Sequence, residues 1–253
     1  MTSISILMAT CNPNINYLRL CLDSIQKQTF KDFELILVDD GTTNCKLEDI
    51  LSTYSFDYQI IKNEINLGLP TSLNKGLQYC NSEYIARMDD DDIMAENRLE
   101  RELQYAKKHD GIIFSRVKKI DLDGREIFFE DHDVNIKLYL KKSGNCLTHS
   151  TLFAKKALLI DVGGYNTKFT YAQDYELYMR LIDKVNFYRM NEQLLFYRIN
   201  TNTNITKRVM SLLYCYGAAI LYFSKGKKLV YNYYFFRRSF SLIRTLYFMV
   251  WKS

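Results

Sequence analysis

The sequence predicts an α/β fold in which a mainly parallel central sheet carries helices on both faces. Short apolar runs rich in β-branched residues alternate with segments of helical spacing over roughly the first 200 residues, as repeated β-α-β units do. Two of the apolar runs end in aspartates, and ligands of such sheets bind at the carboxyl ends of the strands. The 253 residues suffice for one large domain of this kind plus an appendage.

The elements of the first half follow one another in strict alternation. The predicted strands cover 4–9, 33–39, 58–62 and 83–88. The predicted helices cover the segment from Tyr17 to Ile25, then 46–53 and 71–79. The strands are short and β-rich, and apolar residues in the helices recur three or four positions apart.

The second half is expected to continue this pattern with less regularity. A charged amphipathic helix is predicted at 96–108 and a strand at 112–117, followed by a hairpin turn at Asp123-Gly124. The remaining predicted elements are strands at 146–153, 185–190 and 194–199 and a helix at 174–183.

The polar stretch NTNTNIT marks a boundary, so we predict a main domain over 1–203 and a helical tail over 204–253. The balance of acidic and basic residues changes close to this boundary. Glu192 is the last acidic residue, and the ten basic residues beyond it give that part +10 and leave −5 for 1–192 out of a total of +5. The sequence therefore combines a mildly acidic body with a strongly basic tail.

Two aromatic and basic helices are predicted in the tail, at 206–224 and 228–251. The apolar stretch between Arg208 and Lys225 is shorter than the roughly 20 residues that a membrane-spanning helix needs. In the second helix Arg237, Arg238 and Arg244 share one face and leave aromatic residues on the other, which is typical of a helix lying on a membrane surface. A cap packed on the main domain or on a second subunit is the alternative.

Composition and cysteine spacing limit the remaining classes. No nucleic-acid motif accompanies the basic and aromatic residues, so nucleic acid is not an expected partner. The six cysteines show no CxxC pair or zinc spacing and are interpreted as reduced thiols. The N-terminal run lacks the basic region of a signal peptide, so we expect a cytoplasmic protein, held peripherally at the inner face of the cell membrane.

Four consecutive aspartates, 89–92, are the sharpest chemical signal. That many carboxylates at one strand end repel each other, and a cation relieves the repulsion. Oxygen ligands alone favour a hard ion, Mg²⁺ or Mn²⁺. An EF-hand is disfavoured because Ile93 and Met94 occupy positions where that loop needs a ligand and a glycine. The alternative is an exposed acidic turn that caps the following helix.

Asp39-Asp40-Gly41-Thr42 ends the second predicted strand. A carboxylate there can accept from a base N–H or a ribose hydroxyl, and the glycine lets the backbone approach a ligand. A simple Asp-Gly turn is the alternative.

Together the motifs resemble glycosyltransferase family 2, which has the GT-A fold, a Rossmann-like arrangement, over about 3–200. The likeness rests on six segments in the family's order: ISILMATCN, SIQKQTFKDFELILVDDGT, NLGLPTSLNKGL, YIARMDDDDI, THSTLFAKKALLIDVGGY and QDYELYMRL. The resemblance implies an inverting glycosyltransferase, a hexosyltransferase that takes a hexose or N-acetylhexosamine from a nucleotide sugar, with UDP as the expected nucleotide.

The resemblance also assigns a nucleotide site. The residues that it places there are Thr10, Asn12, Asp39, Asp40, Asn66, Asn74, Asp89 and Asp90. Asp39 would hold the uracil or ribose, and Asp40 would support it. Leu73 stands where some relatives have an arginine that faces the base, so that contact is missing here.

The family's aspartate-any-aspartate motif falls on Asp89 and Asp91, and Asp91 would hold the metal that bridges the diphosphate, with Asp89 beside it. Asp92 is either an anchor behind the site or a helix cap. Asp174 matches the catalytic base that takes the acceptor's proton. Many relatives have an acid before that aspartate, whereas this chain has Gln173.

His149, Tyr165 and Gln173 are the candidates for contact with the acceptor or the surroundings of the metal. His149 fits a metal ligand, a partner of the base or an acceptor contact, and equally a hydrogen-bonded structural residue. Tyr165 fits a wall of the acceptor site, and a plain loop residue is its alternative.

The resemblance implies transfer to a hydroxyl of a glycan or a lipid-linked sugar in the synthesis of a bacterial surface polysaccharide or lipopolysaccharide. Association of subunits is compatible with the sequence. A sugar-phosphate nucleotidyltransferase is the enzymatic alternative, although the Gly-rich basic phosphate loop expected near its first strand is absent. A non-catalytic, membrane-bound nucleotide-sugar-binding protein is the other alternative, and it would keep the metal site but need no base.

Overall fold

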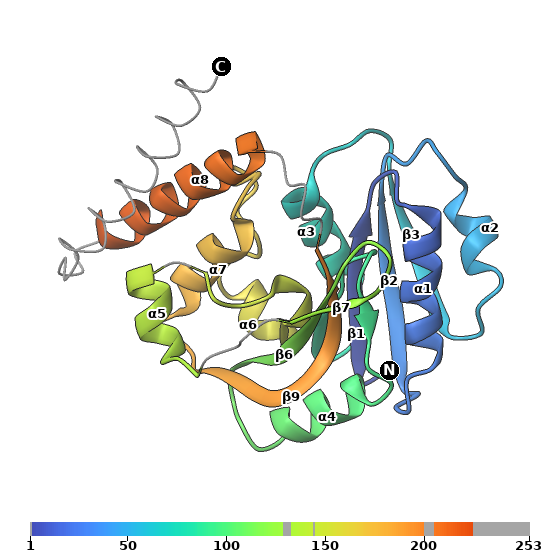
Figure 1. Cartoon of the computed structure of the whole chain (residues 1–253), viewed down its shortest axis with the longest axis horizontal. Helices are drawn as coiled ribbons and strands as arrows, with labels where there is room; N and C mark the ends of the chain where they lie inside the picture. The colour runs from blue at the N-terminus through green and yellow to red at the C-terminus, as the bar shows by residue number, and fades with distance from the viewer. Residues whose placement is uncertain (1, 129–132, 144, 200–204, 225–253) are drawn as a thin grey trace.

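The computed structural model describes residues 2–128, 133–143, 145–199 and 205–224. In this part of the chain a single mixed sheet of nine strands lies between two layers of helices (Figure 1). The strands are β1 Ile4–Thr10, β2 Phe33–Asp40, β3 Asp57–Asn63, β4 Tyr84–Arg87, β5 Ile93–Met94, β6 Ile112–Ile120, β7 Glu126–Ile127, β8 Phe153–Lys155 and β9 Phe187–Arg198. The helices are α1 Ile15–Gln26, α2 Leu47–Leu51, α3 Leu69–Tyr79, α4 Arg98–Ala106, α5 Ile136–Ser143, α6 Lys156–Ile160, α7 Gln173–Leu181 and α8 Ile205–Ser224.

The first half of the sheet has the predicted parallel arrangement. Strand β1 pairs in parallel with β2 on one side and with β4 on the other, and β2 pairs in parallel with β3. All seven residues of β1 are buried, as expected of a strand covered on both faces. The carboxyl ends of β1, β2 and β4 therefore meet at one edge of the sheet.

The second half of the sheet is mixed. Strand β8 pairs antiparallel with both β4 and β6, and β5 pairs antiparallel with β9, while β6 and β9 are parallel. The full order is β3-β2-β1-β4-β8-β6-β9-β5, with β7 attached to β6. The expected hairpin at Asp123-Gly124 is confirmed, because β7 pairs back on β6 and Gly124 has a φ of 83°.

Two sequence predictions for this half were wrong, and two helices were missed. The strand expected at 146–153 is a 3-10 turn, His149–Thr151, followed by the short strand β8, because Thr151 bonds the carbonyl of Thr148 through both its amide and its hydroxyl. The two strands expected at 185–190 and 194–199 form the one strand β9, which absorbs its polar middle in an irregular register opposite β6. Helices α5 and α6 were not predicted.

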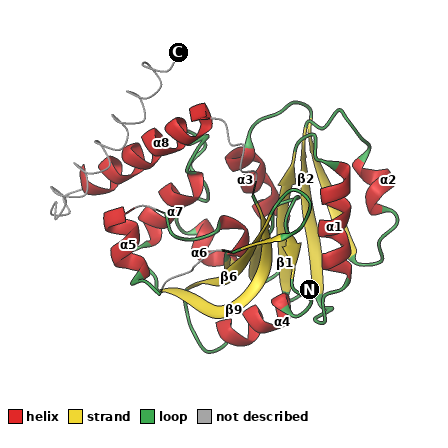
Figure 2. Cartoon of the chain, in the orientation of Figure 1, coloured by secondary structure: helices red, strands yellow, loops and turns green. Residues whose placement is uncertain are grey.

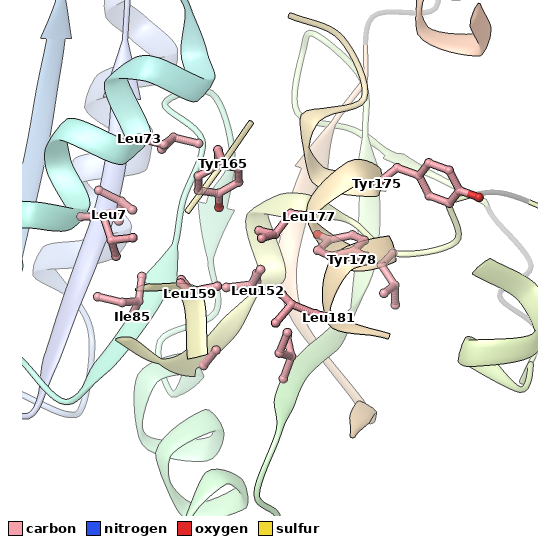
Figure 3. Packing of buried hydrophobic residues seen from close by; sticks show 14 of the residues in the cluster. Leu7, Leu73, Ile85, Leu152, Leu159, Tyr165, Tyr175, Leu177, Tyr178 and Leu181 are labelled. Carbon is pink, nitrogen blue, oxygen red and sulfur yellow. The ribbon is translucent and has the colours of Figure 1, made fainter. Parts of the chain in front are cut away.

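Two hydrophobic clusters fill the spaces on either side of the sheet. One contains Leu7 and Val38 of the sheet together with Leu73 of α3 and Leu177 of α7, and Figure 3 shows its packing. The other contains the opposite faces of the same strands with α1, α2 and α4. Figure 2 shows the resulting order of helix, strand and helix layers. The alternation of side chains along β1 and β2 places successive residues in different clusters.

The beginning of the predicted tail packs on the main domain. The ring of Tyr214 in α8 packs edge-on against Phe169, and its hydroxyl accepts a 3.3 Å hydrogen bond from the Thr170 hydroxyl. Ala218 of the same helix is buried in the cluster that contains Leu177 of α7. The helix predicted at 228–251 lies outside the described residues. Among the helices that the structure describes, none has the length and apolar character needed to cross a bilayer.

Candidate functional site

The polar edge of the sheet gathers residues from three strands. Thr10 is the last residue of β1 and pairs in register with Asp39 of β2, and the four aspartates follow directly after β4 on the other side of β1. The Thr10 hydroxyl donates a hydrogen bond to Oδ2 of Asp90. Residues that are far apart in sequence are thereby brought to one place at the carboxyl ends of parallel strands, where such folds bind ligands.

Asn12 and Asp39 shape the loops that leave β1 and β2. Oδ1 of Asn12 accepts from the amides of Thr43 at 2.8 Å and Asn44 at 3.2 Å, and the backbone of Asn12 has a φ of 51°. Oδ1 of Asp39 accepts from the amide of Thr42 at 2.8 Å, while Oδ2 accepts no hydrogen bond from the described residues. One carboxylate oxygen of Asp39 is thus available to a ligand.

Asp40 fixes the loop that leads into α3. Its Oδ1 accepts from Nδ2 of Asn63 and from the amide of Leu67, each at 2.8 Å, and its Oδ2 accepts from the amide of Gly68 at 2.9 Å. Both oxygens are engaged, so Asp40 acts here as a support for the loop. The exposed side chain of Asn66, also predicted for the nucleotide site, lies in that loop and accepts from the amide of Gly68 at 3.0 Å.

Gly41 allows the β2 loop and the loop before α3 to touch. Its φ is 76°, and a Cβ at this position would lie 2.7 Å from the backbone nitrogen of Asn66. Only glycine suits such a close approach in the left-handed region. The glycine that the sequence offered as a ligand-approach residue is therefore required by loop-to-loop contact.

Asn74 lies on α3 and clamps the backbone of Tyr165. Its Nδ2 donates to the Tyr165 carbonyl and its Oδ1 accepts from the Tyr165 amide, both at 2.7 Å. Asn74 therefore positions Tyr165 in this structure. Its amide nitrogen keeps a second hydrogen, and its contact with the nucleotide stays a prediction.

The first two aspartates of the quartet are held by different partners. Asp89 forms an ion pair with Arg87, 2.5 Å between Oδ1 and Nη2, and Arg87 is fully buried. Burial works against ionisation of Asp89, but the Arg87 cation outweighs it and holds the pKa of Asp89 below its ordinary value. Burial raises the pKa of Asp90, although its hydrogen bond from Thr10 acts in the other direction.

Asp91 and Asp92 differ in their burial and in their hydrogen bonds. Asp92 is fully buried and accepts from the Ser150 hydroxyl at 2.6 Å and the Arg198 amide at 2.8 Å. It is therefore an anchor behind the site, and α4 is preceded by Asn97 rather than by an aspartate cap. Asp91 is half-buried, and burial together with the charges of Asp89 and Asp90 raises its pKa to about 6.

The donor set of this edge fits a hard divalent ion shared with a ligand. In the part of the chain that the structure describes, no group of three or more His, Cys, Asp or Glu side chains forms a preformed metal cage. Mg²⁺ in nucleotide-binding sites typically uses one or two carboxylates and completes its coordination with phosphate oxygens and water. Asp91, whose carboxylate accepts no side-chain hydrogen bond among the described residues, and Asp89 match that requirement.

Asp174 lies in the first turn of α7 and receives a hydrogen bond from a loop residue. Nδ2 of Asn145 donates to its Oδ2 at 2.5 Å, and Oδ1 of Asn145 accepts from the amide of Leu147 at 3.0 Å, which fixes the orientation of the Asn145 amide. Burial raises the pKa of Asp174, the bond from Asn145 lowers it, and the negative charge of Asp89 raises it. Asp174 therefore lies close enough to Asp89 of the quartet to interact with it electrostatically.

The half-buried His149 and the buried Tyr165 form a hydrogen-bonded pair that lies within the electrostatic influence of Arg87. Nε2 of His149 lies 2.9 Å from the Tyr165 hydroxyl, and the rings meet edge to face. Burial and the Arg87 cation lower the pKa of His149 to about 3, so its ring is neutral near pH 7. Tyr165 is only 3% exposed, which places it in the core beneath the site (Figure 3) rather than on an open wall.

Gln173 begins α7 next to Asp174. The residue before it, Ala172, has a φ of 53°, so the chain turns sharply into the helix at this point. The Gln173 side chain is half-buried and makes no hydrogen bond among the described residues. Its contact with an acceptor or metal stays a prediction.

Several residues of the site were not predicted from the sequence. They are Arg87, Asn145, Ser150, Tyr197 and Arg198. An arginine inside an apolar strand, directly before four aspartates, is a signal that could have identified Arg87. Tyr197 could be identified only from the fold, which places it in the wall of the same cavity as Asn145. Burial and the charges of Asp92, Asp89, Asp91 and Asp174 raise its pKa.

Comparison with known proteins agrees with this arrangement. A family model described as "Glycosyl transferase family 2" matches residues 5–161. The chain is 34% identical to an uncharacterized glycosyltransferase, MJ1057, of Methanocaldococcus jannaschii, over 98% of this chain and 88% of that protein. It is 29% identical to the O-antigen biosynthesis glycosyltransferase WbnJ of Escherichia coli, over 91% of this chain and 92% of that protein.

Solved structures share the fold at low sequence identity. S. aureus TarS 1-349 in complex with UDP-GlcNAc matches with a TM-score of 0.65 at 18% identity, over 84% of this chain and 66% of that chain. Mannosyltransferase PcManGT from Pyrobaculum calidifontis, in complex with GDP-Man and Mn²⁺, matches with a TM-score of 0.68 at 16% identity, over 87% of this chain and 64% of that chain. The chain spans only 39% of a longer TarS structure.

Proposed function

The chain belongs to glycosyl transferase family 2, and from this premise we propose that it transfers one sugar from a nucleotide donor to a hydroxyl with inversion. Because the chain is a glycosyltransferase, the alternative of a sugar-phosphate nucleotidyltransferase is excluded. The observation that carries the proposal is the placement of Asp174 in the first turn of α7, where it accepts from Asn145 and lies within the electrostatic influence of Asp89 after β4. A carboxylate base and a set of oxygen ligands for a diphosphate are the two components that this reaction needs.

In the proposed reaction Asp174 accepts the proton of the acceptor hydroxyl. As that oxygen bonds to the anomeric carbon, the bond from this carbon to the donor phosphate breaks, and its electron pair leaves with the nucleoside diphosphate. A single displacement from the opposite face inverts the configuration, so an α-linked donor gives a β-linked product. Asp39 and the Asn12 loop would bind the nucleoside, and Asp40 and Asn74 would act as positioning residues.

Asp91 and Asp89 would hold the divalent ion, Mn²⁺ or Mg²⁺. When bound, such an ion neutralises the charge that develops on the departing diphosphate. The half-buried Asp91 carboxylate supports this assignment, as do the Mn²⁺ and GDP-Man of the mannosyltransferase with the same fold. UDP is the proposed nucleotide, supported by the UDP-GlcNAc complex of TarS.

The proposed acceptor is a glycan or lipid-linked sugar in the synthesis of a surface polysaccharide. The O-antigen enzyme WbnJ and the amylovoran biosynthesis enzyme AmsE of Erwinia amylovora, both similar to this chain, support that role. We also propose that the basic residues after Glu192 hold the protein at the inner face of the membrane. The packing of α8 on the main domain is compatible with that, because the remaining basic residues follow it in sequence.

A donor panel tests the proposed reaction directly. The full chain is incubated with Mn²⁺ or Mg²⁺ and, in turn, UDP-glucose, UDP-galactose, UDP-N-acetylglucosamine, UDP-N-acetylgalactosamine and GDP-mannose, with a bacterial lipid extract as acceptor. Release of nucleoside diphosphate is measured, and the product's anomeric configuration is read by NMR. We expect turnover of a UDP-sugar and a β-linked product, and retention of configuration would contradict the proposal.

Replacing Asn145 by alanine is expected to lower kcat about tenfold and to move the acidic limb of the kcat/KM profile to higher pH. The hydrogen bond from Asn145 stabilises the ionised form of Asp174, so its removal raises the pKa of a base that must be ionised to act. A pH series from 5 to 9 measures the shift. Asn81→Ala, on the exposed turn between α3 and β4, is the matched control and should leave the profile unchanged.

A further inference from the structure

A cavity of about 290 Å³ lies beside the catalytic centre, between strands β6 and β9 and the loop 145–148. Its wall includes Ser115, Arg116 and Lys119 of β6, Arg189 and Tyr197 of β9, and Asn145 of the loop. Its volume is at the lower end of ligand sites, which run from about 300 to 1,000 Å³. A cavity of this size suits one sugar ring with a small substituent.

Two lining residues connect this cavity to the proposed chemistry. Asn145 donates its hydrogen bond directly to the carboxylate of Asp174. Tyr197 lies within the electrostatic influence of both Asp174 and the aspartate quartet. A molecule in the cavity would therefore adjoin the base, and the opposite side of the quartet, toward Thr10 and Asp39, is where the nucleotide is proposed to lie.

The charge of the lining is cationic and its described counter-ion is exposed. Arg116 and Arg189 both form ion pairs with Asp133, whose side chain is 82% exposed, whereas the side chains of the arginines are 22% and 11% exposed. The guanidinium groups are thus mostly buried at the cavity, while the carboxylate that they pair with lies at the surface. Arginine's planar fork suits the paired oxygens of a phosphate or a carboxylate.

The backbone of β6 around Arg116 and the buried hydroxyl of Ser115 also indicate a ligand site in this cavity. The pairing of β6 with β9 shifts register on both sides of Arg116, and such irregularities re-aim side chains and occur beside active sites. Ser115, next to Arg116, is 4% exposed, lines the cavity, and its Oγ makes no hydrogen bond among the described residues. A buried hydroxyl without a partner is costly, and a ligand oxygen would satisfy it.

We infer that this cavity is the acceptor subsite and that it takes a sugar carrying an anionic group, a phosphate or a carboxylate, held by Arg116 and Arg189. The inference rests on the proposed function, because it places the reacting hydroxyl beside Asp174. The anion is either the phosphate that links a sugar to its carrier or the carboxylate of an acidic sugar, and both present the same paired oxygens to the arginines.

Binding of small glycosides tests the inference without turnover. The full chain is saturated with UDP and Mn²⁺, so that the nucleotide site is filled, and titrated by calorimetry with matched charged and neutral probes. One pair is methyl glucuronoside against methyl glucoside, and the other is methyl N-acetylglucosaminyl phosphate against methyl N-acetylglucosaminide. We expect at least tenfold tighter binding of the charged member of one pair, and that pair identifies the source of the anion.

The double substitution Arg116→Gln and Arg189→Gln should bring the charged-to-neutral affinity ratio to within about twofold of unity. Arg125→Gln, on the exposed hairpin turn, is the matched control and should keep the wild-type ratio. Thermal unfolding of each variant verifies the fold, and the single substitutions replace the double one if it unfolds. The inference would be overturned if the wild type bound charged and neutral probes equally well, or if the charged-to-neutral affinity ratio were unchanged in the arginine variants. It would also be overturned if Arg125→Gln lowered that ratio as much as the arginine variants do.

This readout separates the inference from the proposed function. If the chain turns over a donor but shows no preference for charged probes, only the acceptor inference fails. If it turns over no donor, the proposed function fails, whereas a charge preference abolished by the arginine substitutions would still identify an anion site at this cavity.

Discussion

Replacing Asp174 by asparagine is expected to lower kcat by about 10² to 10⁴-fold, the range that a positioned general base contributes. Asparagine keeps the shape and the contact with Asn145 but cannot take a proton. Affinity for the donor should change less than about threefold, because Asp174 bonds to Asn145 near β6 and β9, whereas the proposed nucleotide residues Thr10 and Asp39 end β1 and β2. Single-turnover rates with the preferred UDP-sugar give kcat, and calorimetry with UDP and Mn²⁺ gives the donor affinity.

A matched control separates loss of the base from a general effect of removing a carboxylate. Asp110→Asn removes an 83% exposed side chain that pairs only with Lys155 among the described residues, so transfer should be unaffected. Because burial raises the pKa of Asp174, activity of the wild type should fall with decreasing pH earlier than a free aspartate would cause. Unchanged transfer by Asp174→Asn would refute the assignment of the base and the inverting mechanism with it.

The sequence predicted the first half of the fold well because the signals there are local. Strands β1, β2 and β4 are short apolar runs that are almost entirely buried, β3 is a more exposed edge strand, and each is separated from the next by a helix. The meeting of the polar strand ends at one edge follows from the same alternation of strands and helices. Parallel strands placed side by side must bring Thr10, Asp39 and the quartet to one edge.

The second half of the fold depends on contacts between distant residues, which the spacing of apolar residues in the sequence does not predict. The segment 145–151 has apolar residues that favour a strand, but the chain turns there. Asn145 donates a hydrogen bond to the distant Asp174, and the Thr148 carbonyl accepts one from the nearby Thr151 hydroxyl. Helix α5 is short and carries several lysines, which obscure its apolar stripe. In the same way Asn145 was not identified as part of the site, because its partner Asp174 is remote in sequence and only the fold brings the two together.

Buried charge was the other feature that pattern reasoning missed. Arg87 and Arg98 have no exposed surface, although arginine is rarely buried without a partner. Arg98 pairs with Glu102 at 3.0 Å and donates to the carbonyl of Arg87, which in turn pairs with Asp89. This chain of contacts fixes the end of β4 and places a cation beside Asp89, the first of the four carboxylates.

Replacing Asp91 by asparagine is expected to reduce transfer by at least about 10³-fold, since loss of an ion that neutralises a leaving diphosphate costs several kcal/mol and each 1.36 kcal/mol is tenfold in rate. Affinity for Mn²⁺ in the presence of UDP should fall as well, because an amide is a weaker ligand than a carboxylate. Electron paramagnetic resonance of free Mn²⁺ measures that binding without any turnover. Removal of metal from the wild type by chelation should have the same effect on transfer, and added Mn²⁺ should reverse it.

The arrangement of the quartet makes the effect specific to Asp91. Asp92 is committed to Ser150 and Arg198, and Asp90 and Asp89 each have one oxygen engaged, by Thr10 and Arg87 respectively. Asp91 is the member of the run whose carboxylate accepts no side-chain hydrogen bond among the described residues, so its loss should weaken the ion's binding most. Asp123→Asn, on the exposed hairpin turn, is the control and should bind Mn²⁺ as the wild type does. Normal Mn²⁺ affinity in Asp91→Asn would mean that the ion is held elsewhere. Because metal binding stabilises only the folded form, the rise in melting temperature on adding UDP and Mn²⁺ should shrink in Asp91→Asn and persist in Asp123→Asn.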